Sequence, residues 1–114
     1  MTSLSPAALV AVEEAVRAVV DRDDERLALL APDAGDLYIW TRDYGRYGVV
    51  DLVVPPGTAE DWDIVSTDQH DGGQHVAVGM WTRQEGRSDL TLELQLDCDD
   101  QGRCRPRILD LHVL

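Results

Sequence analysis

One segment of alternating residues constrains the fold more than any other feature of the chain. Residues 90–97 alternate strictly between leucine and a polar side chain: Leu90-Thr91-Leu92-Glu93-Leu94-Gln95-Leu96-Asp97. Successive side chains of a β-strand point to opposite faces of the sheet, so the segment predicts a strand with one apolar and one polar face. An apolar sheet face must be covered by a second layer. The chain is therefore expected to fold into at least two layers.

The same period of two recurs along the second half of the chain. It predicts further strands at residues 49–54, 62–67, 76–82 and 108–114. In the last of these, Leu109, Leu111 and Val113 are expected on the apolar face, with Asp110 and His112 on the other. Turns at residues 71–73 and 99–102 are short, and short turns require antiparallel pairing. We expect about four consecutive strands in one curved antiparallel sheet.

The first part of the chain supplies the covering layer. Ser5 is a typical helix N-cap and Pro6 a typical first residue, and apolar residues then recur in steps of three and four, at Leu9, Val12, Val16, Val19 and Val20. This predicts an amphipathic helix over residues 6–21. Asp23 or Asp24 can cap a second, short helix with Leu27, Leu30 and Ala31 as its buried stripe. Residues 36–45 fit either a helix or a strand, and the helix is favoured.

Length and composition bound the fold class. The chain has 114 residues, of which 44% are hydrophobic, enough for one core and not for two. The predicted architecture is α+β: a single domain over residues 1–114, with N-terminal helices packed on a curved antiparallel sheet.

Charge limits the class of partner. The chain has 22 acidic residues against 10 basic ones, all of them arginine, which gives a net charge of −12. Such a field repels nucleic acids and anionic membranes and attracts basic proteins. The N-terminus does not resemble a signal peptide, and no apolar run could cross a bilayer, so a cytoplasmic location is expected.

Two segments resemble known families. The helix of residues 16–20 runs through the acidic break Asp21-Arg22-Asp23-Asp24 into a second helix that ends in Leu29-Leu30-Ala31, which resembles the opening of the NTF2-like (SnoaL-like) superfamily. Residues 86–94 and 108–114 resemble a family of small uncharacterised bacterial proteins. The first resemblance implies a cone-shaped roll of sheet around a helix. Relatives with that fold include isomerases, cyclases, dehydratases, binding modules and immunity proteins, so the resemblance leaves the function open.

An NTF2-like enzyme would place acids, histidine or tyrosine inside the apolar cone. The weak catalytic candidates on that basis are Tyr38, Asp89, Asp110 and His112, with Tyr44 beside them. The alternation of the last strand sends Asp110 and His112 outward, away from the cone. The sequence therefore argues against an enzyme.

Metal and cofactor signatures are weak or missing. Residues 97–102 resemble the start of a calcium loop, but Ile108 stands where the bidentate glutamate is needed. The chain has no glycine-rich phosphate loop and no known hydrolase motif. No metal and no cofactor are expected.

Two cysteines flank the turn at residues 99–102. A hairpin would bring Cys98 and Cys104 within bonding distance, but a reducing cytoplasm favours free thiols.

The three tryptophans, Trp40, Trp62 and Trp81, are expected in the core or at its rim.

These observations favour a non-enzymatic acidic domain that binds a basic protein. In its sharpest form this is an immunity protein that neutralises a basic toxin. The expected contact surface, called here the outer patch, consists of Glu93, Gln95, Asp97, Asp110 and His112. The alternatives are an NTF2-like enzyme or small-molecule binder that uses the cone, and a homodimer formed through the open sheet face.

Overall fold

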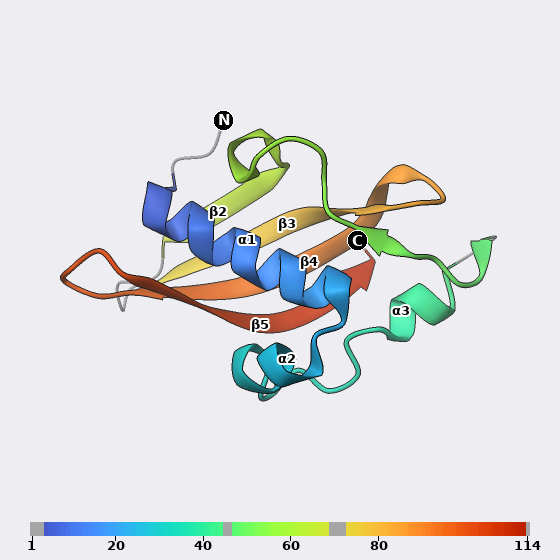
Figure 1. Cartoon of the computed structure of the whole chain (residues 1–114), viewed down its shortest axis with the longest axis horizontal. Helices are drawn as coiled ribbons and strands as arrows, with labels where there is room; N and C mark the ends of the chain where they lie inside the picture. Colours follow the sequence, from blue (N-terminus) through green and yellow to red (C-terminus); the bar gives the residue numbers. More distant parts are fainter. Residues whose placement is uncertain (1–3, 45–46, 69–72, 114) are drawn as a thin grey trace.

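The computed structural model describes residues 4–44, 47–68 and 73–113. Three α-helices and one short 3-10 helix are found there: α1 (Pro6–Asp21), α2 (Asp24–Leu30), α3 (Ile39–Arg42) and η2 (Ala59–Asp61). Five strands follow the helical region: β1 (Leu52–Val53), β2 (Ile64–Asp68), β3 (Gln74–Thr82), β4 (Gly86–Cys98) and β5 (Cys104–Val113). They form one antiparallel sheet that curls beneath α1, as Figure 1 shows. The predicted α+β class with N-terminal helices is confirmed.

Helix α1 begins and ends as its sequence predicts. The Ala8 amide donates to Ser5 Oγ at 3.2 Å, and Pro6 occupies the first turn. The helix stops at Arg22, which takes a left-handed conformation with φ of 52°. Val12 and Val16 are fully buried against the sheet.

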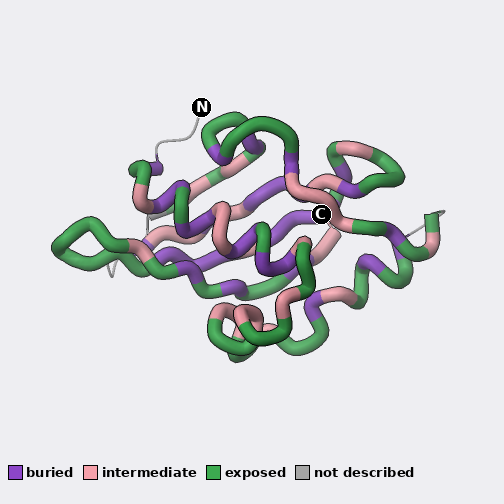
Figure 2. The backbone as a smooth tube through the Cα atoms, in the orientation of Figure 1, coloured by how far each residue is buried: buried purple, intermediate pink, exposed green. Residues whose placement is uncertain are grey.

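The leucines of β4 form the centre of the core. Leu90, Leu92, Leu94 and Leu96 have no exposed surface, because β4 lies between β3 and β5 under α1. Figure 2 shows this buried band running along the middle of the sheet beneath the helix. The alternation of residues 90–97 thus predicts the core correctly.

The prediction for the last strand is wrong at Leu109. A bulge shifts the register between β4 and β5: Glu93 pairs with Asp110, and Leu94 pairs with Ile108. The extra residue puts Ile108 and Leu111 into the core and leaves Leu109 37% exposed. A bulge adds one residue to one strand, and this breaks the two-residue period locally.

The strand expected at residues 49–54 is reduced to the two residues of β1. Both β1 and β2 pair with the same edge of β3, β1 at its C-terminal end and β2 over Gln74–Val78. The edge is therefore shared, and Pro55 then ends the pairing because proline has no N–H to donate.

The helix favoured for residues 36–45 is confirmed, although it is only one turn long. The turn predicted at residues 71–73 lies mostly outside the described residues.

Two further expectations are corrected by the structure. Cys98 and Cys104 form a disulfide, with a sulfur–sulfur distance of 2.08 Å. The hairpin brings the two residues directly opposite one another in the register of β4 and β5, which favours the bond over the expected thiols. Trp62 is buried, but Trp40 is 44% exposed, because the single turn of α3 does not bring it onto the core.

Among the described residues, no helix has the length and hydropathy required to span a bilayer.

Candidate functional site

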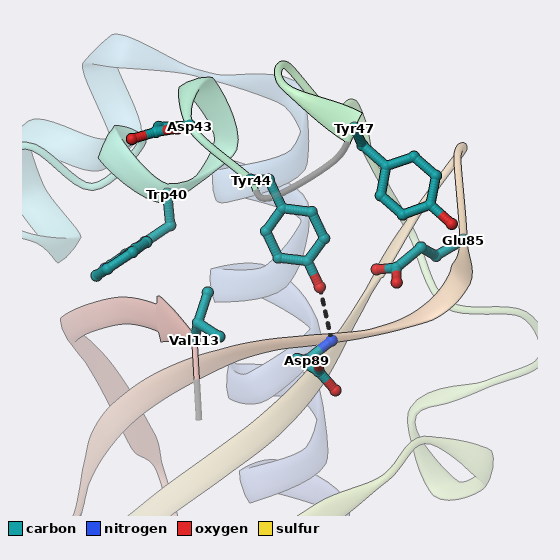
Figure 3. A pocket seen from close by; sticks show the side chains of 7 residues that line it. All are labelled: Trp40, Asp43, Tyr44, Tyr47, Glu85, Asp89 and Val113. Atoms are coloured by element: carbon teal, nitrogen blue, oxygen red, sulfur yellow. Dashed lines mark hydrogen bonds between the residues drawn. The ribbon is translucent and has the colours of Figure 1, made fainter.

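A pocket of about 340 Å³ lies at one end of the curled sheet, opposite the disulfide-closed hairpin. Its walls come from α3 and the segment after it, from the turn between β3 and β4, and from the end of β5. We call it the aromatic pocket, and its lining residues are Trp40, Asp43, Tyr44, Tyr47, Glu85, Asp89 and Val113. Figure 3 shows Trp40 and Val113 on one side of Tyr44, with Tyr47 and Glu85 on the other. Three separate parts of the chain therefore build this site.

Tyr44 is the fixed centre of the pocket. Its amide donates to the carbonyl of Gly48 at 2.8 Å, and its hydroxyl accepts a hydrogen bond from the Asp89 amide at 3.0 Å. Gly48 has a φ of 64°, a conformation that favours glycine. The Tyr44 and Tyr47 rings are nearly parallel, at 19°, with centroids 6.4 Å apart. One ring is thus held at both ends, with a second ring packed beside it.

Three carboxylates, Asp43, Glu85 and Asp89, line the same space. None of the described lining residues carries a positive charge. Two arginines near these residues in the sequence, Arg42 and Arg83, are paired elsewhere. Arg42 pairs with Asp36, and Arg83 lies 3.8 Å from the Asp51 carboxylate. The described walls therefore combine aromatic faces with negative charge.

The pKa of Tyr44 reflects these surroundings. Burial raises the pKa of its hydroxyl, and the hydrogen bond from the Asp89 amide partly offsets this. A hydrogen bond with Glu85 and the negative charges of Glu85 and Asp89 raise it further. Burial is thus the main cause of the net rise, and the neighbouring carboxylates add to it.

The outer patch lies on the sheet face turned away from α1. Its centre is Glu93, whose side chain is only 19% exposed and lies between two histidines. His112 Nε2 is 3.1 Å from Glu93 Oε1, and His75 Nε2 is 2.5 Å from Glu93 Oε2, although the second contact lacks the alignment of a hydrogen bond. Burial lowers the pKa of His112, but the hydrogen bonds to Glu93 and to the Val113 carbonyl and the charges of Glu93 and Asp110 together raise it overall.

Two other members of the outer patch stand opposite arginines, whereas Asp110 stands opposite Glu93. Gln95 pairs with Arg107 across β4 and β5, and Asp97 pairs with Arg105. Both arginines are exposed and lie on the same face as their partners. The structure thus places the five predicted residues on one face, and cations of the same domain lie among their carboxylates.

The weak catalytic candidates lie in three different surroundings. The Tyr38 hydroxyl donates to the Val19 carbonyl at 2.7 Å, and its ring lies 3.9 Å beneath the Arg22 guanidinium. Asp89 lines the aromatic pocket, whereas Asp110 and His112 belong to the outer face. The structure does not bring the four together into one site.

Sequence reasoning considered Tyr44 and Asp89 but missed Asp43, Tyr47 and Glu85, and it placed Trp40 in the core or at its rim. A signal was present, because four of the six aromatic residues fall within residues 38–47. Aromatic residues close to acids and glycines in a segment of uncertain structure are typical of a binding loop.

Within the part of the chain that the structure describes, no three histidine, cysteine or acidic side chains are grouped so that they could hold a metal ion.

Comparison with known proteins identifies a family without assigning an activity. A family model described as a domain of unknown function, DUF7668, matches residues 12–114. No curated protein matches the chain, and no solved structure does. The curled sheet beneath a helix is compatible with an NTF2-like fold.

Proposed function

The chain belongs to the DUF7668 family, and we propose that it is a non-enzymatic acidic domain that binds a basic protein partner through the aromatic pocket and its rim. The observation that carries the proposal is the pocket itself, in which three aromatic rings and three carboxylates share one space. Aromatic residues in concave, partly exposed positions are frequent anchors of protein interfaces. The net charge of −12 would attract a basic partner from a distance and speed the encounter.

The surface around the pocket supports a macromolecular partner. Eight large hydrophobic residues are exposed among the described residues, and four of them lie within residues 39–49. We call these four the apolar rim: Ile39, Trp40, Tyr47 and Val49. Their exposed fractions run from 36% at Tyr47 to 65% at Val49. Trp40 and Tyr47 line the pocket, and the other two belong to the same short segment of the chain. Several exposed apolar groups in one segment favour contact with another protein, whereas single exposed residues need no explanation.

The outer patch fits a basic partner less well. Arg105 stands opposite Asp97 and Arg107 opposite Gln95 on the same face, so the negative charge of the patch is partly balanced within the domain. Asp43, Glu85 and Asp89 have no cation among the described residues of their pocket. Relief of that repulsion favours binding at the pocket.

The test uses a partner isolated from the native host by cross-linking to the full chain. Its affinity is then measured for two variants with the same change in net charge. Asp43→Lys with Glu85→Lys alters the pocket, and Asp97→Lys with Asp110→Lys alters the outer patch. We expect the affinity for the partner to fall about a hundredfold or more in the first variant and much less in the second. Equal losses would mean that only the overall charge matters, and the proposal would then be wrong.

The immunity-protein hypothesis is a specific form of this proposal. It requires the partner to be a toxin encoded beside this chain, and co-expression with the chain should abolish its toxicity. Loss of that protection in the Asp43→Lys, Glu85→Lys variant is the expected result.

The second candidate function is an NTF2-like small-molecule binder or enzyme. Its support is the pocket volume of about 340 Å³, which lies at the lower end of the range for small-ligand sites. A thermal-shift screen against neutral and charged metabolites would test it. A neutral compound that raises the melting temperature of the natural chain, but not of a Tyr44→Ala variant, would favour this alternative.

A further inference from the structure

We propose that the aromatic pocket receives a single guanidinium group, the side chain of an arginine on the partner. This inference rests on the proposed function and specifies the chemical group that the pocket recognises. It follows from the combination of ring faces, carboxylates and a fixed geometry in one site.

The rings provide the first part of the recognition. Trp40, Tyr44 and Tyr47 all line the pocket, and Trp40 and Tyr47 are also partly open to solvent. The face of an aromatic ring carries negative potential, so a cation above it is attracted, and tryptophan and tyrosine do this better than phenylalanine. A flat guanidinium can also stack on such a ring, which a tetrahedral ammonium cannot do.

The carboxylates provide the second part. A guanidinium presents five N–H donors along its edges while its face stays free for stacking. Glu85 and Asp89 both lie close to the Tyr44 hydroxyl, Asp89 through its amide and Glu85 through a hydrogen bond. A group stacked in the pocket therefore has acceptors beside it, and charge-assisted hydrogen bonds to carboxylates are stronger than neutral ones.

The site is largely formed before any ligand arrives. Tyr44 is only 8% exposed and is held by Gly48 at its amide and by Asp89 at its hydroxyl. Less ordering is then required on binding, which favours affinity. The apolar rim around the pocket favours an arginine carried by a protein over a free amine.

The experiment is a titration of the full chain with four small probes, followed by NMR. The probes are N-acetylarginine amide, N-acetylcitrulline amide, N-acetyllysine amide and tetramethylammonium. Citrulline has nearly the shape of arginine but no charge. The indole N–H signal of Trp40 reports binding and is assigned with a Trp40→Phe variant.

We expect the arginine probe to shift the Trp40 signal with an affinity at least roughly tenfold above that of the citrulline probe. It should also bind more tightly than lysine or tetramethylammonium, and its affinity should fall as salt is added. Equal binding of arginine and lysine would overturn the choice of guanidinium. Equal binding of arginine and citrulline would overturn recognition of a cation altogether.

Matched variants locate the site. The Glu85→Gln, Asp89→Asn variant should bind the arginine probe about tenfold more weakly, or weaker still. The Asp97→Asn, Asp110→Asn variant removes the same charge, and its affinity for the probe should stay within about twofold of that of the natural chain. Near-ultraviolet circular dichroism verifies that both variants are folded. Equal losses in the two variants would refute the pocket as the binding site.

The inference and the proposed function can fail separately. If no probe binds but the partner still loses affinity in the Asp43→Lys, Glu85→Lys variant, the pocket binds a partner without taking an arginine. If arginine binds but the partner is unaffected by that variant, the pocket recognises a guanidinium that this partner does not supply, and the proposed function is wrong.

Discussion

A substitution in α1 tests how the helix covers the sheet. Val16 and Val10 lie on the same helix, but Val16 is fully buried and Val10 is 70% exposed. Changing each to alanine removes the same atoms from two different environments. The difference between the two variants therefore measures packing against the sheet, because helix propensity changes equally in both.

The magnitude follows from the burial. Val16→Ala removes two buried carbon groups, worth about 0.8 kcal/mol each, and the cavity left behind adds about 1 kcal/mol, giving a loss of about 2.5 kcal/mol. A domain of 114 residues has an expected stability of about 6–17 kcal/mol, so the variant should still fold. With an unfolding entropy of about 0.24 kcal/mol/K for this length, the melting temperature should fall by about 10 °C.

Differential scanning calorimetry and urea denaturation of the two variants provide the measurement. Val10→Ala should melt within about 2 °C of the natural chain, or slightly above it, because alanine is the better helix former. If Val16→Ala melts at the same temperature as Val10→Ala, α1 does not pack on the sheet through Val16. A Val16→Asp variant that melts cooperatively near the natural temperature would lead to the same conclusion, since a buried unpaired charge should unfold the domain.

Three further outcomes are expected. The Cys98→Ser, Cys104→Ser double variant should fold but lose at most about 2 kcal/mol in urea denaturation, because the disulfide closes a loop of only six-residue separation; failure to fold would mean that the bond is essential. Burial lowers the pKa of His112, but its hydrogen bonds and the neighbouring carboxylates raise it overall. The raised pKa adds stability that is fully present below about pH 6.5 and is lost as the pH rises through the folded pKa. His112→Gln should therefore flatten the stability profile between about pH 5 and about pH 8, and an unchanged slope would contradict this. Finally, the chain should give no gel shift with DNA or RNA at micromolar concentration in about 0.15 M salt, because its charge of −12 repels phosphates.

The periodic spacing of apolar residues predicts most of the fold. Two apolar patterns extend over enough residues for the buried positions to follow directly from their spacing: the three- and four-residue steps of α1 and the alternation of residues 90–97. Both segments lie at the centre of the domain, where the core imposes its pattern on every residue. Sequence reasoning was therefore reliable where one face of an element is completely covered.

Short or irregular segments were less predictable. Of the strand expected at residues 49–54, only Leu52 and Val53 pair, because β3 ends at Thr82 and residues 49–51 have no strand opposite them. No local pattern reveals where the partner strand ends. The exposure of Trp40 depends on α3 being a single turn. The expected compartment predicted free thiols at Cys98 and Cys104. The register of the hairpin, which places the two residues opposite one another, instead favours the disulfide.

The aromatic pocket could be predicted only in part. Its residues come from α3 and the loop after it, the turn after β3 and the end of β5, and the register that pairs Leu90 with Val113 brings the start of β4 to the end of β5. The clustering of aromatic residues before Gly48 indicated one wall, but Glu85 and Val113 gave no local signal. A site assembled from distant turns requires the register of the whole sheet.

The bulge in β5 also bears on how this chain tolerates changes in length. Leu109 is the additional residue, placed between Ile108, which faces the core, and Asp110, which pairs with Glu93. Deleting Leu109 would leave Ile108, Asp110 and Leu111 alternating as in a regular strand, with every core side chain still on its own face. Deletion of either neighbour would instead remove a core residue or a paired one. Position 109 is therefore the point in this strand where evolution can add or remove one residue without exchanging the two faces of the sheet.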